Sequence, residues 1–200
     1  MKKPEGRYKP LRMTSIYAHF AKQTQLPVRL SDIHDFIMGK GVVARMERYA
    51  CPTKNGLVGI FQSFYDLAPP YQEAPLIVRI GYPASATEGA QRLVQAKEML
   101  HALDPDNARS PTPDAVAELI DDLLFEAAER EIGVPAQVDH LNFINALAVL
   151  MPLAALDLIR PAYKKGKVTL EQVAEEARLP AGFVSVTLAD EWEDIAKTLL

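Results

Sequence analysis

The apolar residues of this chain recur with two different periods, which separate helical from extended segments. Spacings of three and four residues predict helices at residues 13–23, 31–39, 87–103, 113–131 and 136–150, and two short helices at 169–177 and 181–200. Runs of β-branched and aromatic residues predict strands at residues 42–49, 57–65 and 76–80. We therefore expect an α+β fold that is mainly helical, with a small three-stranded sheet, antiparallel at least in part, packed on a helix layer.

Two of the predicted helices have apolar patterns that place them in the fold. The inward positions of the helix at 87–103 are Leu93, Ala96, Leu100 and Leu103. The helix at 136–150 is apolar nearly all round, with Leu141 and Leu147 among the positions expected to face inward, so it belongs in the middle of the molecule. The apolar run at 146–156 leaves room for a dimer face, so a homodimer stays open.

Composition and charge exclude several classes of protein. The chain has 200 residues, 48% of them hydrophobic, and its 22 Lys and Arg against 26 Asp and Glu give a formal net charge of -4. This composition is globular, and the charge provides no general attraction for nucleic acid. The single cysteine, Cys51, excludes an internal disulfide. No export signal is visible, and the longest apolar run is too short to span a bilayer, so we expect a soluble cytoplasmic protein.

The segment most informative about chemistry is Lys97-Glu98-Met99-Leu100-His101, within the helix that follows the third strand. In zinc proteases with the HExxH motif, two histidines four residues apart bind the metal, and the glutamate between them activates the bound water. Glu98 and His101 occupy the positions of that glutamate and of the second histidine. Lys97 occupies the position of the first histidine. A surface pair of glutamate and histidine with no such role is the alternative interpretation.

The surroundings of this motif resemble the ImmA/IrrE family of small metallopeptidases over residues 56–152. The similar features are a strand, an arginine and an alanine ahead of the motif (Arg92 and Ala96), and a later helix that ends in Leu150-Met151-Pro152. The resemblance implies that the helix layer is zincin-like. It also implies a division into a metallopeptidase-like domain with N-terminal helices at residues 1–160 and a tail at residues 161–200.

The resemblance also implies roles for individual residues. Glu98 matches the catalytic glutamate, His101 the second zinc ligand and Asp139 the acidic third ligand, with His140 as a substitute ligand. A structural role for Asp139 and His140 at the start of a helix is equally open. The cleft would therefore comprise Lys97, Glu98, His101, Asp139 and His140.

Lys97 is the departure from the family pattern, and it changes the expected function. An ammonium group is a poor zinc ligand, and its charge can replace that of the metal beside Glu98 or Asp139. We therefore expect no metal or other cofactor and no peptidase activity, but a regulatory module that binds a protein, such as a transcriptional repressor of a bacterium or prophage. The alternative is a zinc peptidase that uses His101, Asp139 and His140 as ligands and Glu98 as the base.

Residues 170–184 have the helix, turn, helix pattern of a DNA-binding element, so a DNA-binding regulator is a further alternative. The second helix of this element, at residues 181–188, has no Arg, Lys, Asn or Gln to contact base edges. We therefore expect the tail to pack on the first domain or to dock a partner rather than bind nucleic acid. The aromatic residues of the second strand (Phe61, Phe64 and Tyr65) serve either core packing, which we expect for at least half of them, or a peptide groove.

Overall fold

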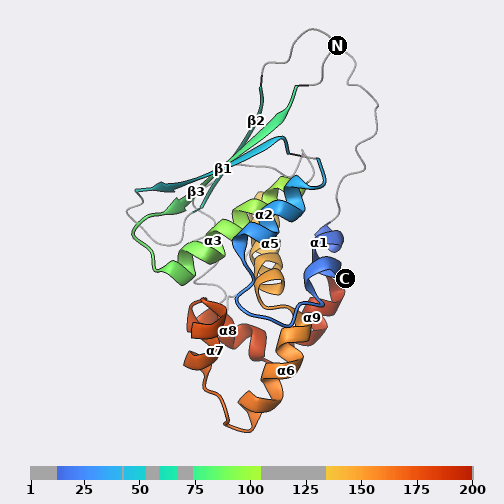
Figure 1. The fold of residues 1–200 in the computed structure, drawn as a ribbon, viewed down its shortest axis with the longest axis vertical. Coiled ribbons are helices and arrows are strands. Elements are labelled where there is room, and N and C mark those ends of the chain that lie inside the picture. The colour runs from blue at the N-terminus through green and yellow to red at the C-terminus, as the bar shows by residue number, and fades with distance from the viewer. Residues whose placement is uncertain (1–12, 42, 53–58, 67–73, 105–133, 200) are drawn as a thin grey trace.

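A computed structural model describes residues 13–41, 43–52, 59–66, 74–104 and 134–199, and for residues 134–140 it describes the backbone alone. The elements over these ranges are shown in Figure 1. The helices of the first half are α1 (Met13–Phe20), α2 (Leu30–Met38) and α3 (Glu88–Leu100), which continues into the short 3-10 helix η1 (His101–Leu103). The strands are β1 (Arg45–Cys51), β2 (Ile60–Tyr65) and β3 (Leu76–Pro83). The second half consists of α5 (Val134–Leu150), α6 (Leu153–Lys164), α7 (Leu170–Ala177), α8 (Ala181–Leu188) and α9 (Trp192–Thr198).

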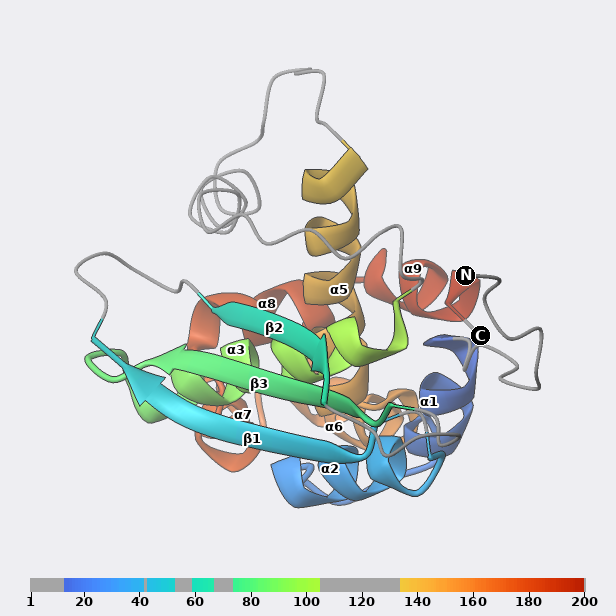
Figure 2. The ribbon, with the colours of Figure 1, turned by 90° about the horizontal axis from the view of Figure 1, so that it is seen from above.

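The α+β class and the three-stranded sheet predicted from the sequence are confirmed. The sheet has the order β1-β3-β2, with β3 parallel to β1 and antiparallel to β2. The helices α2 and α3 lie against one face of it, as Figure 2 shows. On that face the side chains of Leu76, Val78 and Ile80 join the core. The sheet is therefore mixed, with its most apolar strand in the centre.

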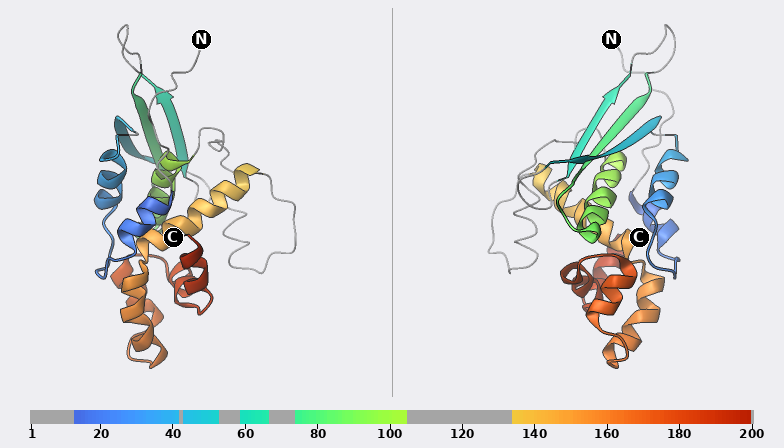
Figure 3. Two further views of the ribbon diagram at one scale, coloured as in Figure 1. Left: turned by 90° about the vertical axis from the view of Figure 1, so that its right-hand side faces the viewer. Right: turned by 60° about the vertical axis from the view of Figure 1, so that its left-hand side comes forward.

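Helix α3 is capped by Thr87, whose hydroxyl accepts a hydrogen bond from the amide of Ala90. Its inward positions agree with the prediction, since Leu93, Ala96, Leu100 and Leu103 are all buried. Helix α5 packs against α3 and also contacts α1 and α8, so it lies in the middle of the fold (Figure 3). The apolar residues of the run at 146–156 are mostly buried inside the chain, and a dimer face there stays a prediction.

Several local predictions are wrong. The helix predicted at residues 31–39 begins at Leu30 instead, and its cap position is Arg29, whose side chain pairs with Asp32 at 2.8 Å. Leu141 was expected to face inward but is 53% exposed, because α5 directs Asn142 and Asn145 inward at this level instead. The helix predicted at residues 113–131 lies outside the described residues.

The C-terminal part contains one helix more than predicted at each end of the helix-turn-helix element. Helix α6 follows Pro152 and includes Pro161. In the sequence, both prolines favour an interruption of helical structure. The predicted helix at 181–200 is divided into α8 and α9, because Ala189 has an extended conformation. Helices α6 to α9 form a group at the end of the molecule away from the sheet (Figure 1). Since α6 crosses the expected boundary at residue 160, the division into two domains stays a prediction.

A buried arginine holds this group together. Arg160 of α6 donates a hydrogen bond of 2.9 Å to the carbonyl oxygen of Thr187 in the last turn of α8, and its second nitrogen lies 3.5 Å from Glu193 of α9. A cation at this place satisfies a carbonyl group that the end of a helix leaves unpaired. In the part of the chain that the structure covers, no single helix has the length and apolar character needed to cross a membrane.

Candidate functional site

The residues of the Lys97–His101 motif lie in the interior, where α3 faces the start of β2 and the middle of α5. Lys97 and Glu98 are each only 2% exposed. The ammonium nitrogen of Lys97 lies 2.9 Å from Oε1 of Glu98, and Nζ donates a hydrogen bond to that oxygen. Burying two charged groups is costly unless they are paired, so this contact makes the position of both side chains tolerable.

Strand β2 packs closely over this ion pair. Gly59, immediately before β2, leaves no space for a side chain, because a Cβ atom there would overlap the carboxylate of Glu98. Two residues later, the ring of Phe61 lies 5.5 Å from the ring of His101. The backbone at Gly59 and the ring of Phe61 therefore cover Glu98 and His101 from the side of the sheet.

A second set of polar contacts extends from His101 to α5. Nδ1 of His101 lies 2.7 Å from Oδ2 of Asp104, and Nδ2 of Asn142 lies 2.7 Å from the same oxygen. Asn145 in turn donates a hydrogen bond of 3.1 Å to Oδ1 of Asn142. The carboxylate of Asp104 accepts hydrogen bonds, so we assign a proton to Nδ1 of His101 in this contact. In the neutral ring, Nε2 then carries no proton.

The structure brings three of the predicted cleft residues together. Nε2 of His101 lies 3.9 Å from Oε2 of Glu98, and Glu98 is paired with Lys97. Asp139 and His140 belong to the first half of α5, and their side chains lie outside the described residues. The ligand set of His101, Asp139 and His140 therefore stays a prediction. Among the residues that the structure describes, no group of three or more His, Cys, Asp and Glu side chains is placed to hold a metal ion.

Sequence reasoning missed the residues that orient His101. Asp104 was interpreted only as the end of a helix before Pro105, and Asn142 and Asn145 were included in an apolar helix. The available signal was the pair of amide side chains three residues apart on α5, a spacing that puts both on one face of a helix. Both asparagines are buried, and polar groups in such an environment normally have specific partners.

Arg92, which matches the lead-in of the family motif, has a structural position in the fold. Its guanidinium donates a hydrogen bond of 2.6 Å to the carbonyl oxygen of Val28, ahead of α2. Burial lowers the pKa of Arg92, because the charged form is disfavoured away from water. Arg92 thus connects α3 with the segment between α1 and α2, and it takes no part in the contacts of Lys97, Glu98 and His101 described above.

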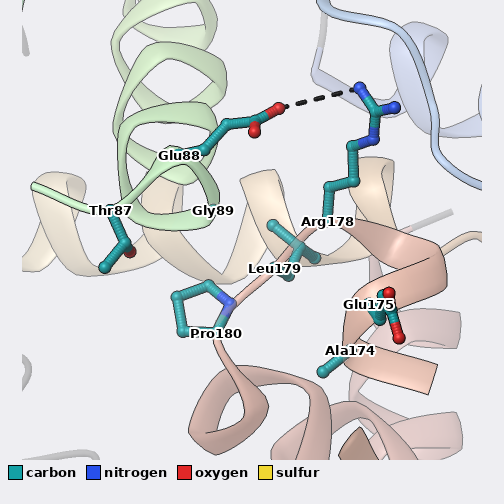
Figure 4. Close-up of a pocket in the computed structure, with 8 residues that line it drawn as sticks. All are labelled: Thr87, Glu88, Gly89, Ala174, Glu175, Arg178, Leu179 and Pro180. Atoms are coloured by element: carbon teal, nitrogen blue, oxygen red, sulfur yellow. Dashed lines mark ion pairs between the residues drawn. The ribbon is translucent and has the colours of Figure 1, made fainter. Parts of the chain in front are cut away.

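A separate pocket of about 360 Å³ lies between the first turn of α3 and the turn from α7 to α8 (Figure 4). Glu88 and Arg178 form an ion pair of 3.6 Å beside it, and Gly89 allows α3 to approach Leu179 closely. Glu88, at the pocket, lies about 13 Å along α3 from Lys97, at a rise of about 1.5 Å for each residue. Of its three charged lining residues, Glu88 and Arg178 are paired with each other, and the third is Glu175.

Comparison of the chain with protein-family models, with curated proteins and with solved structures finds no match. The resemblance to the ImmA/IrrE family therefore depends on the residues named in the sequence analysis alone. The geometry adds the burial of the motif, the ion pair within it and the contact of His101 with Asp104.

Proposed function

We propose that this chain is a catalytically inactive metallopeptidase-like domain that acts as a regulatory module by binding another protein, such as a transcriptional repressor. The observation that supports it is the buried ion pair of Lys97 and Glu98, 2.9 Å apart and each 2% exposed. The ammonium group belongs to the residue at the position of the first histidine in the HExxH pattern. It also binds the carboxylate that would serve as the base.

The ion pair opposes zinc chemistry in two ways. A fixed positive charge at the ligand position repels a divalent cation, and an ammonium group has no lone pair to donate to the metal. The hydrogen bond from the Lys97 ammonium also occupies Oε1 of Glu98, an oxygen that a base would need to accept a proton from water. A scaffold with these properties keeps the shape of a peptidase but loses its reaction, which suits a role in binding.

One observation favours the alternative, a zinc peptidase with altered ligands. Histidines that bind metals usually donate their second ring N–H to a carboxylate, and the 2.7 Å contact between His101 and Asp104 is of this type. In this alternative Glu98 would be the base. A DNA-binding role has no comparable support, because the exposed residues of α8, Gly182 and Ser185, provide no charged group for phosphate contacts.

The test is the zinc content of the purified native chain beside that of a Lys97→His variant. We expect the native chain to lack stoichiometric zinc and Lys97→His to acquire it, because that change supplies the missing imidazole and removes the positive charge. Lys97→Arg is the matched control, since it replaces the side chain but keeps the charge, and it should bind no zinc.

Three results would overturn the proposal. Stoichiometric zinc in the native chain that disappears in His101→Ala would establish the metal-binding alternative. Chelator-sensitive cleavage of a peptide that Glu98→Gln abolishes would establish it as an enzyme. A folded Lys97→His variant that binds no zinc would show that the remaining ligands of a metallopeptidase are not in place.

A further inference from the structure

The two outer strands of the sheet differ in how their free edges are protected. Proteins usually place charged residues or proline on edge strands, because unpaired backbone groups there attract other strands. Strand β1 follows this rule with Arg45, Glu47 and Arg48. Strand β2 has the sequence Ile-Phe-Gln-Ser-Phe-Tyr, without a charged residue or a proline, and its Tyr65 is 63% exposed.

The hydrogen bonds of β3 determine which backbone groups of β2 face outward. The amide of Asp66 donates to the carbonyl oxygen of Pro75 at 3.0 Å. Since hydrogen-bonded pairs alternate in an antiparallel ladder, Phe64, Gln62 and Ile60 also direct their N–H and C=O groups to β3. The residues between them, Phe61, Ser63 and Tyr65, therefore direct theirs to the free edge. Within the ranges that the structure describes, no strand pairs with that edge.

We propose that two copies of this chain associate through β2, antiparallel and about a two-fold axis at Ser63, so that one sheet continues through both copies. The outward pattern of aromatic, serine, aromatic is the same in both directions along the strand. Ser63 would lie opposite its own copy, and Phe61 would lie opposite the partner subunit's Tyr65. Aromatic residues opposite each other stabilise a strand pair, and the two-fold axis provides this pair twice.

The remaining residues of β2 also suit a second copy. On the opposite face of the sheet, Phe64, which is 37% exposed, would lie opposite the partner subunit's Gln62. No like charges would meet, because β2 has none, whereas two β1 edges would bring several charged residues together. Since the ring of Phe61 lies 5.5 Å from that of His101, the partner subunit's Tyr65 would be added beside the ring that covers His101. This inference does not depend on the proposed function.

The first experiment measures the mass of the full chain by sedimentation velocity over a wide range of concentrations. We expect a dimer that dissociates on dilution, since a strand pair alone forms a small interface. Ser63→Pro removes an outward N–H that makes no bond to β3, so the variant should fold but stay monomeric. Ser63→Ala keeps that N–H and should dimerise like the native chain.

A second pair of variants provides a positive signal. Ser63→Cys should form an intermolecular disulfide under mild oxidation, because residues directly opposite in such a pair have Cα atoms about 5.5 Å apart. Gln62→Cys is the control, since the two-fold axis places it opposite Phe64 and about 7–8 Å from its own copy, beyond the reach of a disulfide.

Three outcomes would overturn the proposal. A native chain that stays monomeric at its highest soluble concentration excludes the dimer. The same result is expected if β2 pairs instead with an extended segment of another protein, so that case also counts against the proposal. A folded Ser63→Pro variant that dimerises as the native chain does places the interface elsewhere. Equal cross-linking of Ser63→Cys and Gln62→Cys rejects the two-fold axis at Ser63. If Ser63→Pro does not fold, Ser63→Lys replaces it, because like charges directly opposite should abolish the dimer.

Discussion

A Cβ atom on Gly59 would lie 2.6 Å from Cδ of Glu98, closer than two carbon atoms can approach without displacement. The strand that covers the buried ion pair therefore requires glycine at this position for reasons of space alone. This contact connects the start of β2 to the middle of α3. It also means that the position of Glu98 depends on a residue outside its own helix.

Gly59→Ala should lower the free energy of unfolding by about 1–3 kcal/mol, because a methyl group in this closely packed place displaces Glu98 from Lys97. Urea denaturation measures the change. In a Glu98→Ala background the same substitution should cost clearly less, since the atoms it meets are gone. Gly41→Ala is the control, because it introduces backbone strain but no steric overlap. Gly41 has a φ of +70°, and a Cβ atom there would have no neighbouring atom within 4 Å. An equal cost of Gly59→Ala in both backgrounds would contradict the proposed overlap.

Asn142→Leu should destabilise the chain by about 1–3 kcal/mol, because Asp104 and Asn145 would each lose a buried hydrogen-bond partner. Thermal and urea unfolding measure the loss. The neighbouring substitution Leu141→Ala is the control and should stay within about 0.5 kcal/mol, since Leu141 is exposed. Similar effects of the two substitutions would mean that the contacts of Asn142 contribute nothing specific.

Arg160→Met should loosen the C-terminal helices and cost about 1.5–3 kcal/mol, the usual contribution of a hydrogen bond to a charged group. The bond that is lost joins Arg160 to the carbonyl oxygen of Thr187. Hydrogen exchange should become faster in α8 and α9 before it changes in the sheet. Lys164→Met is the matched control, because its ion pair with Asp190 is exposed to solvent and contributes little to stability.

The stability of the C-terminal helices should decrease in acid. A hydrogen bond from Lys164 lowers the pKa of Asp190 below its ordinary value of 3.8, and one from Lys197 lowers the pKa of Glu193 below 4.5. A pKa that is lower in the folded state stabilises the fold above the unfolded pKa, and this contribution is lost as the pH falls through the folded pKa. Unfolding temperatures should therefore begin to fall below about pH 5.

Asp190→Asn and Glu193→Gln together should flatten this acid dependence, because neither side chain can then bind a proton in this range. High salt should reduce the same dependence in the native chain, since both ion pairs are exposed to solvent and are screened. An unchanged pH profile in the double variant would assign the acid sensitivity to other carboxylates.

The elements that could be predicted from sequence are those whose apolar period matches their environment. In α3 the core residues Leu93, Ala96 and Leu100 stand three or four positions apart, so they were identified correctly. At residues 141–145 α5 does not follow this rule, because the buried Asn142 contacts His101 and Asp104 there. Hydrophobic periodicity alone puts Leu141 inside at this level, where the structure places Asn142.

The candidate site was predicted in part for a related reason. The spacing of Lys97, Glu98 and His101 within one helix determines their relative positions, so their proximity follows from the sequence. Contacts between distant segments do not follow in this way. Gly59 and Asn142 reach the motif only because β2 and α5 pack on α3, and a single sequence contains no direct signal of that packing.

The order of the strands has a consequence for synthesis on the ribosome. Strand β3 lies between β1 and β2 in the sheet but comes last in the chain. A nascent polypeptide that has emerged only as far as Asp66 therefore has both outer strands and nothing to join them. The sheet can form only after Pro83 has left the exit tunnel, and until then the aromatic residues of β2 are available to chaperones.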